Sequence, residues 1–118
     1  MPRRFMQSLK YAGNGIKHAF WTQRNIRIHL MIAFLVIALG LVLNITSYEM
    51  VAIVLAICFV IMSEMINTSI EEVVNLVVRE HRREALIAKD VAAGAVLFSA
   101  FCAIITGLLI FIPHLFRR

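Results

Sequence analysis

Residues 64–75 read Glu-Met-Ile-Asn-Thr-Ser-Ile-Glu-Glu-Val-Val-Asn and close a long apolar run of the chain. At about 100° per residue, five polar side chains fall within roughly 100° of one helix face: Glu64, Asn67, Thr68, Glu71 and Asn75. We call these five residues the polar stripe. Carboxylates at membrane depth are costly and normally face a bundle interior or a wet cavity. The polar stripe therefore predicts a functional site on a membrane helix.

The composition indicates an integral membrane protein, because 61% of the 118 residues are hydrophobic and only 16% are charged. Residues 30–48, 50–63 and 91–116 contain no formal charge. Spans of about 20 apolar residues are typical of transmembrane helices. We predict an all-α fold in one domain, residues 1–118, with membrane helices at 28–43, 50–78 and 88–112. The second span reaches that length only by continuing through the polar stripe, and Pro113 is expected to end the third.

The N-terminal segment, residues 1–26, is basic but carries apolar side chains at helical spacing. Phe5, Leu9, Ile16 and Phe20 recur four, seven and four residues apart, which predicts one apolar helix face. This pattern is typical of an amphipathic helix that lies on a membrane surface. We expect residues 13–15, Gly-Asn-Gly, to interrupt the helix.

The basic residues predict the orientation in the membrane. Ten of the 12 lysines and arginines lie before the first span or between the second and third, and two lie at the C-terminus. The positive-inside rule puts the N-terminus and the second loop in the cytoplasm and the C-terminus outside. Anionic lipid headgroups explain this charge more simply than nucleic acid does, so no nucleic-acid partner is expected.

The residue types near the inner ends of the spans favour phosphoryl transfer, which needs positive charge, a hard cation and a positioned base. Glu64 suits a general base for a lipid hydroxyl. Glu71 suits a Mg²⁺ ligand, and Lys89 suits a phosphate contact. The competing interpretation is a polar seam that only specifies helix association, because polar side chains also hydrogen-bond across membrane helices.

Two motifs resemble the small prokaryotic diacylglycerol kinase and undecaprenol kinase family: Glu64-x-x-Asn67-Thr68-x-Ile70-Glu71-x-x-Val74 and Ala88-Lys89-Asp90-x-Ala92-Ala93-Gly94-Ala95-Val96. The segments 15–17 and 25–29 also look like this family, and the resemblance covers essentially the whole chain. It implies a homotrimer in a bacterial plasma membrane, with active sites shared between neighbouring chains. It also implies MgATP-dependent phosphorylation of a membrane lipid hydroxyl at the cytoplasmic face.

The resemblance assigns roles to individual residues. Glu64 is implied as the base, supported by Asn67, and Glu71 as a Mg²⁺ ligand at the nucleotide. The remaining implied nucleotide contacts are Arg4, Tyr11, Glu80, His81, Arg82, Lys89 and Asp90. Two positions depart from the family pattern. Gln23 stands where a second metal-binding Glu is common, so it is predicted as a neutral nucleotide and metal contact, and Asn75 stands where Asp is usual.

The Arg-Asn-Ile-Arg-Ile-His stretch and the Ala-Ala-Gly-Ala-Val stretch look more like the branch whose implied substrate is undecaprenol, with diacylglycerol as the alternative. Two other function classes stay open. One is a small proton-coupled transporter subunit with Glu64 as its ion site, and the other is a purely structural membrane oligomer. Replacing Lys89 with Ala would cripple only the kinase, whereas replacing Glu64 with Gln would be tolerated only by the structural oligomer.

Overall fold

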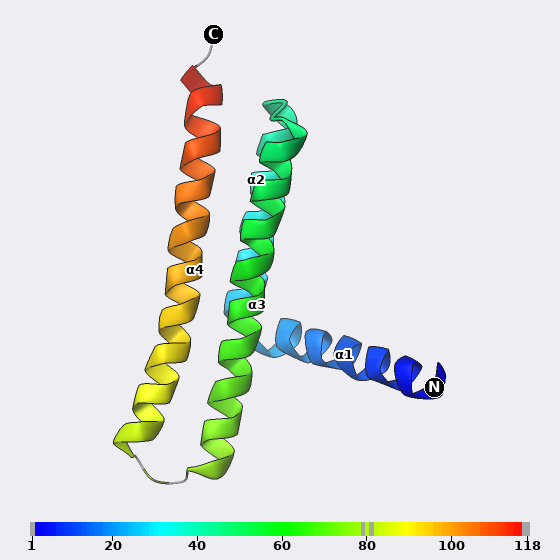
Figure 1. The fold of residues 1–118 in the computed structure, drawn as a ribbon, viewed down its shortest axis with the longest axis vertical. Coiled ribbons are helices and arrows are strands. Elements are labelled where there is room, and N and C mark those ends of the chain that lie inside the picture. The colour runs from blue at the N-terminus through cyan, green and yellow to red at the C-terminus, as the bar shows by residue number, and fades with distance from the viewer. Residues whose placement is uncertain (1, 79, 81, 117–118) are drawn as a thin grey trace.

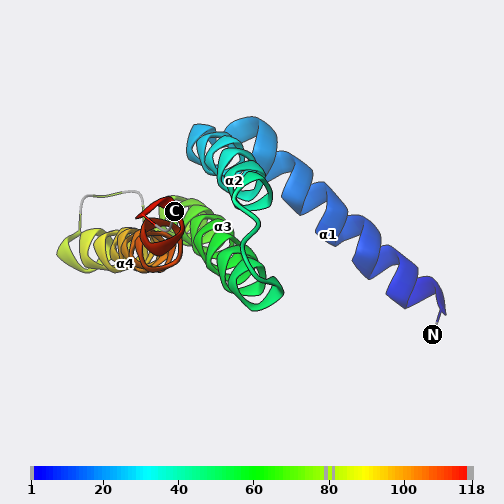
Figure 2. The same ribbon diagram turned by 90° about the horizontal axis from the view of Figure 1, so that it is seen from above.

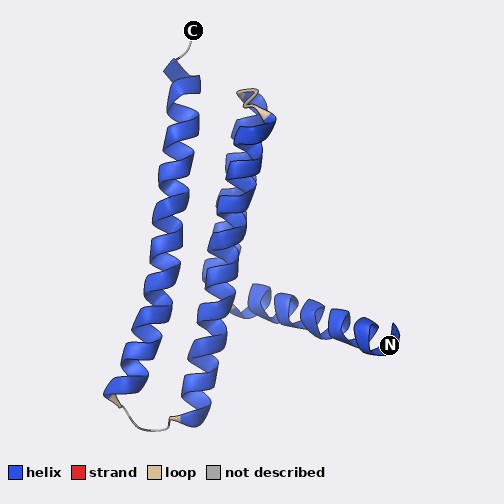
Figure 3. Ribbon diagram, in the orientation of Figure 1, coloured by secondary structure: helices blue, strands red, loops and turns tan. Residues whose placement is uncertain are grey.

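The computed structural model describes residues 2–78, 80 and 82–116. Within these residues the chain forms four α-helices (Figures 1 and 3): α1 (Pro2–Thr22), α2 (Arg24–Val42), α3 (Ser47–Val77) and α4 (Arg83–Phe116). The last three are each long and apolar enough to cross a membrane. The predicted helical membrane fold is thus confirmed for the described part of the chain.

The three apolar helices run alongside one another, and α1 leaves them sideways. The most extensive packing is between α3 and α4, while the other face of α3 packs against α2. Figures 1 and 2 show α1 extending from the base of α2 on the side away from α4. The surface helix and α4 therefore flank the central pair α2 and α3 from opposite sides.

The helices differ in length, so the two longer helices extend beyond the shortest one at one end of the molecule. The α2 helix has 19 residues, whereas α3 has 31 and α4 has 34. At about 1.5 Å per residue, α2 spans roughly 28 Å, close to the roughly 30 Å hydrocarbon core of a bilayer. Both longer helices extend past the level at which α1 leaves the bundle (Figure 1). The end where residues 78–82 connect them, which we call the hairpin end, thus lies beyond the span of α2.

The opposite end is closed by a tight turn between α2 and α3. Asn44 adopts a left-handed φ of 54°, a conformation that asparagine tolerates better than most residues. The Thr46 hydroxyl accepts from the Glu49 backbone N–H at 3.1 Å, and the Glu49 carboxylate accepts from the Thr46 N–H at 2.9 Å. This capping box satisfies two backbone donors at the start of α3. His114 near the end of α4 lies 2.9 Å from the same Glu49 carboxylate and ties α4 to this turn.

Two expected interruptions are absent from the described helices. The α1 helix continues through Gly13 and Gly15. Glycine costs a helix only about 1 kcal/mol relative to alanine, so the apolar face can carry the helix through it. The α4 helix likewise continues past Pro113 to Phe116 instead of ending at 112. In apolar surroundings a backbone that left the helix would lose its hydrogen-bond partners, so a proline is accommodated within it.

The helix bounds differ from the expected ranges at several further ends. The surface helix stops at Thr22, four residues before the end of the range 1–26, and α2 begins directly after Gln23. The α3 helix begins at Ser47, before residue 50, because of its capping box. The α4 helix begins at Arg83, before residue 88. The charged residues after the hairpin connection are therefore helical.

Candidate active site

The central feature of the polar stripe is a buried carboxylate at the contact between α2 and α3. Glu64 is only 4% exposed, although it lies on a helix with largely apolar neighbours. Its Oε1 atom lies 3.5 Å from Nε2 of His29, which comes from the second turn of α2. Buried charges are normally paired, and this histidine is the basic partner that the structure offers Glu64.

The stripe continues towards the hairpin end with Asn67, one turn beyond Glu64, and Glu71, two turns beyond it. The Asn67 side-chain amide donates a hydrogen bond to Oε1 of Glu71 at 3.2 Å. The Asn67 Oδ1 atom is buried and has no hydrogen-bond partner in the described part of the chain. The Thr68 hydroxyl donates to the backbone carbonyl of Glu64 at 2.9 Å, so it is used within its own helix. Glu71 and Asn67 thus present oxygen donors that a hard cation or a polar ligand can use.

Gln23 lies at the joint between α1 and α2. Its backbone is extended, with φ −108° and ψ 109°, and its side chain makes no capping hydrogen bond to α2. The Arg27 guanidinium stabilises the joint by donating to the carbonyls of Phe20 at 2.8 Å and Trp21 at 3.0 Å, at the end of α1. The chain therefore bends at Gln23, and α2 begins directly after it.

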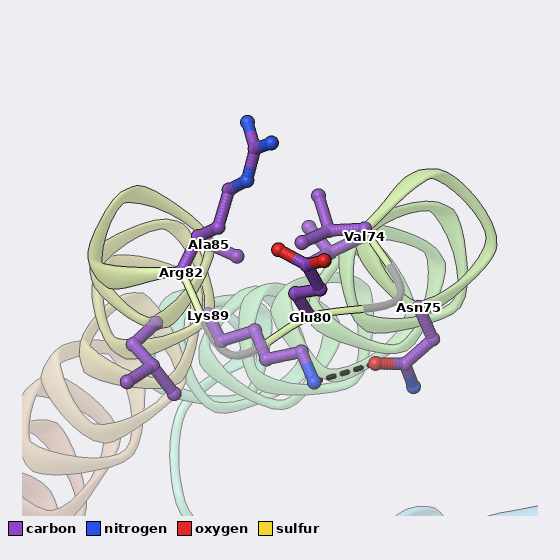
Figure 4. A pocket seen from close by; sticks show the side chains of 8 residues that line it. Val74, Asn75, Glu80, Arg82, Ala85 and Lys89 are labelled. Carbon is purple, nitrogen blue, oxygen red and sulfur yellow. Dashed lines mark hydrogen bonds between the residues drawn. The ribbon is translucent and has the colours of Figure 1, made fainter.

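A second polar site lies at the hairpin end, between α3 and α4. A cavity of about 330 Å³ is lined there by Asn75, Glu80, Arg82 and Lys89, together with four apolar side chains. We call it the hairpin pocket. Figure 4 shows Lys89 reaching from α4 towards Asn75 on α3, and its Nζ donates to the Asn75 Oδ1 atom at 2.5 Å. The Arg82 side chain points away from this bond (Figure 4).

The other predicted contacts are dispersed in the single chain. Tyr11 is 67% exposed on α1, and Arg4 is exposed near the start of the same helix. The α1 helix extends away from α4. Asp90 is exposed and does not line the hairpin pocket, although Lys89 does. His81 lies outside the described residues. Along α3, Glu64 and Asn75 are separated by about 16 Å at the usual rise per residue.

Comparison with known proteins identifies the family of this chain. Residues 10–111 match the family model for prokaryotic diacylglycerol kinase. The chain belongs to the prokaryotic diacylglycerol kinase family. It is similar to a diacylglycerol kinase of Synechocystis, with 41% identity over 109 residues, which cover 92% of this chain and 62% of that protein. It is also similar to an undecaprenol kinase of Bacillus subtilis, with 39% identity over 112 residues, which cover 95% of this chain and 91% of that protein.

The family match includes every predicted site residue except Arg4, which precedes residue 10. Within the matched range, the structure gathers six of the predicted residues at two sites: Glu64, Asn67 and Glu71 in the bundle, and Glu80, Arg82 and Lys89 at the hairpin pocket. Both sites include residues of α3. A substrate that reaches both would therefore extend along this helix.

Two further residues gain importance from the structure. His29 is not among the predicted site residues, but it pairs with the buried Glu64. Asn75 was noted only as a departure from the family pattern, but it holds Lys89. His29 lies opposite Glu64 and Lys89 lies opposite Asn75, and such pairing between helices cannot be calculated from the spacing within one helix.

Proposed function

We propose that this chain is a lipid kinase, with residues 1–118 acting as one domain that transfers a phosphoryl group from ATP to the hydroxyl of a membrane lipid. The observation that carries this proposal is Glu64, a carboxylate that is 4% exposed at the contact of two apolar helices, with His29 beside it. A buried carboxylate inside an apolar bundle is a strong candidate for function. The family membership favours the kinase over the transporter and the structural oligomer.

In this proposal, Glu64 acts as the general base. The lipid hydroxyl oxygen attacks the γ-phosphorus of ATP, Glu64 accepts the hydroxyl proton, and the bond to the bridging oxygen breaks so that ADP leaves. Asn67 supports the site by holding Glu71 through its side-chain amide. A positioned base of this kind contributes about 10²–10⁴-fold to a rate.

The hairpin pocket is proposed to bind the nucleotide. Lys89 supplies positive charge to a phosphate, and Arg82 is a second cation at the same cavity. Asp90, Glu80, His81 and Gln23 are proposed as further contacts along the nucleotide. Arg4 and Tyr11 complete this set, and both belong to α1, which extends away from α4 in the single chain. A homotrimer with active sites shared between neighbouring chains would supply them from a second copy.

Mg²⁺ is the proposed metal, and the residues of the polar stripe fit it. Mg²⁺ is usually held by one or two carboxylates together with substrate phosphates. Glu71 offers the carboxylate, and the unpartnered buried oxygen of Asn67 is of the same hard donor type. Gln23 offers only a neutral oxygen. When bound, the metal neutralises developing charge on the phosphates.

The proposed acceptor is undecaprenol, with diacylglycerol as the alternative. One of the two similar relatives is named a diacylglycerol kinase and the other an undecaprenol kinase, so both lipids are candidates. The site is proposed to face the cytoplasm of a bacterial cell, with the N-terminus inside and the C-terminus outside, because the basic residues gather at the hairpin end and on α1. This orientation gives the hairpin pocket access to cytoplasmic ATP.

A phosphorylation assay tests the proposal directly. The purified chain in mixed micelles is incubated with γ-³²P-ATP, with undecaprenol or diacylglycerol, and with or without Mg²⁺. We expect Mg²⁺-dependent label in one of the two lipids. Glu64→Gln should abolish the label, whereas the matched control Glu49→Gln at the other end of α3 should retain it, because glutamine also fits a capping box. Label in neither lipid at saturating Mg²⁺ would refute the kinase assignment.

A further inference from the structure

Three side-chain hydrogen bonds connect α3 and α4 in the described part of the chain. They lie at the two ends and near the middle of the helix pair: His114 with Glu49, Ser63 with Ser99, and Lys89 with Asn75. Along α3 these positions are 14 and 12 residues apart, and along α4 their partners are 15 and 10 residues apart. Nearly equal steps on both helices are expected for an antiparallel pair in one fixed register, because both helices rise equally per residue. The contact between Lys89 and Asn75 is therefore set by the register of the whole helix pair.

The residue that holds Lys89 is neutral. The Lys89 ammonium donates to the Asn75 Oδ1 atom at 2.5 Å. In the described part of the chain, this ammonium forms no ion pair with a carboxylate. Glu80 is the one carboxylate among the described residues that line the hairpin pocket, and Figure 4 shows it pointing away from the Lys89–Asn75 bond. The positive charge of Lys89 is therefore not cancelled by the residue that holds it.

This arrangement leaves Lys89 able to bind an anion. A lysine ammonium has three donors, and the bond to Asn75 uses one of them. An asparagine oxygen accepts this bond without a formal charge, whereas a carboxylate in the same place would also repel a phosphate. A flexible lysine loses rotamer freedom when it binds a ligand, and a lysine that is already restrained loses less. Both effects favour a negatively charged ligand in the hairpin pocket.

We propose that Asn75 is a positioning residue of the nucleotide site, which restrains the Lys89 ammonium at the hairpin pocket and leaves its charge available to the nucleotide phosphates. This inference rests on the proposed kinase function and deepens it, because it names a residue that sets the affinity of the pocket for a polyanion. Asn75 acts through Lys89 and not by a contact of its own with the phosphates.

Two substitutions of Asn75 separate the restraint from the charge. Asn75→Ala removes the partner of Lys89. Restraining one flexible side chain changes affinity by about 2- to 12-fold, so this variant should bind ATP at least about twofold more weakly. Asn75→Asp keeps an acceptor but adds a negative charge. A carboxylate and a phosphate that each lie about 2.8 Å from one ammonium are at most about 6 Å apart. Their repulsion in a water-like dielectric weakens ATP binding about threefold for each charge on the nearest phosphate.

Equilibrium binding of a fluorescent ATP analogue to the purified chain in micelles, at low and at physiological salt, measures both effects. Asn75 is exposed, so both variants should fold. Asn75→Asp should reduce the salt dependence of binding, because the pocket becomes less positive, whereas Asn75→Ala should leave the salt dependence unchanged. Asn44→Asp, the same charge change in the turn between α2 and α3, is the matched control and should bind ATP as the wild-type chain does, since aspartate also tolerates the left-handed backbone there.

A second measurement asks whether Asn75 acts through Lys89. In a Lys89→Met background the ammonium is absent, so Asn75→Ala should cause no further loss of ATP affinity. A merely structural role of Asn75 would give the same loss in both backgrounds, and that result would overturn the inference. Either Asn75 variant binding ATP as tightly as the wild-type chain would also overturn it.

The binding measurements fail separately from the kinase proposal. If the wild-type chain binds ATP but transfers no phosphate to either lipid, the kinase proposal fails and the binding series still decides the role of Asn75. If phosphate is transferred and both Asn75 variants bind ATP like the wild-type chain, the role of Asn75 is wrong and the kinase proposal stands.

Discussion

Replacing Glu64 with Gln separates catalysis from nucleotide binding, because the proposed base and the hairpin pocket lie at different levels of α3. Glutamine has nearly the same shape as glutamate, so the buried site keeps its packing. It cannot accept a proton from the lipid hydroxyl. We expect the rate of phosphoryl transfer at saturating substrates to fall about 10²–10⁴-fold, the usual contribution of a positioned general base.

The expected effect on ATP binding follows from the distance along α3. Glu64 and Asn75 are 11 positions apart, about 16 Å along the axis. The hairpin pocket is therefore too far from residue 64 for the substitution to change the contacts that the pocket makes with the nucleotide. The γ-phosphate that reacts must come close to residue 64, and a neutral glutamine does not repel it as a carboxylate does. ATP should therefore bind at least as tightly as it binds the wild-type protein.

Two measurements decide this prediction. Single-turnover transfer from radiolabelled ATP to the lipid reports the chemical step, and equilibrium binding of a fluorescent ATP analogue reports the hairpin pocket. Glu49→Gln, the same chemical change on the same helix, should leave both unchanged. If Glu64→Gln weakens ATP binding as much as it slows transfer, or slows transfer less than tenfold, Glu64 is not the base.

Three further substitutions test other parts of the site. Lys89→Met should raise the KM for ATP at least about fivefold, because a charge contact at about 4 Å is worth about 1 kcal/mol even in water, whereas an unchanged KM would remove Lys89 from the nucleotide site. Gln23→Glu should shift the Mg²⁺ titration of activity to lower concentration if residue 23 faces the metal, and a clear loss of activity would mean that this position has another role. Arg27→Gln should loosen the α1–α2 joint by about 1.5 kcal/mol, because it removes charge-assisted hydrogen bonds to the Phe20 and Trp21 carbonyls; faster proteolysis between residues 20 and 24 measures this, and unchanged protection would contradict it.

The sequence predicted the membrane helices well because apolar length and the period of the polar stripe are local properties. The buried position of Glu64 followed from the same reasoning, since a carboxylate in an apolar helix needs a protected environment. The breaks expected at Gly13 and Pro113 were wrong because residue propensities are small beside the packing and hydrogen-bonding demands of a long helix. The hydropathy pattern does not reveal where α3 and α4 begin. The start of α3 at Ser47 depends on a capping box, and the start of α4 at Arg83 lies in a charged segment.

The contacts between helices could not be obtained from the sequence in the same way. His29 meets Glu64, and Lys89 meets Asn75, across pairs of helices whose rotation and relative height depend on packing. An apolar groove between α2, α3 and α4 likewise depends on three small residues of α4 that line it: Ala100, Ala103 and Gly107. A stripe of small residues on a membrane helix commonly predicts a close helix contact, and only the relative placement of α2, α3 and α4 turns it into a cavity.

The unequal helix lengths explain how one chain can serve a water-soluble and a lipid substrate. The α3 and α4 helices exceed α2 by 12 and 15 residues, about 18 and 22 Å of helix. This excess carries the hairpin pocket out of the layer that α2 spans, where charged phosphates remain hydrated. Glu64 faces α2 near its first turns, at the edge of the apolar layer, because its partner His29 is only five residues from the start of that helix. The proposed base thus lies between the apolar layer, which suits a lipid, and the hairpin pocket, which is proposed to bind the nucleotide.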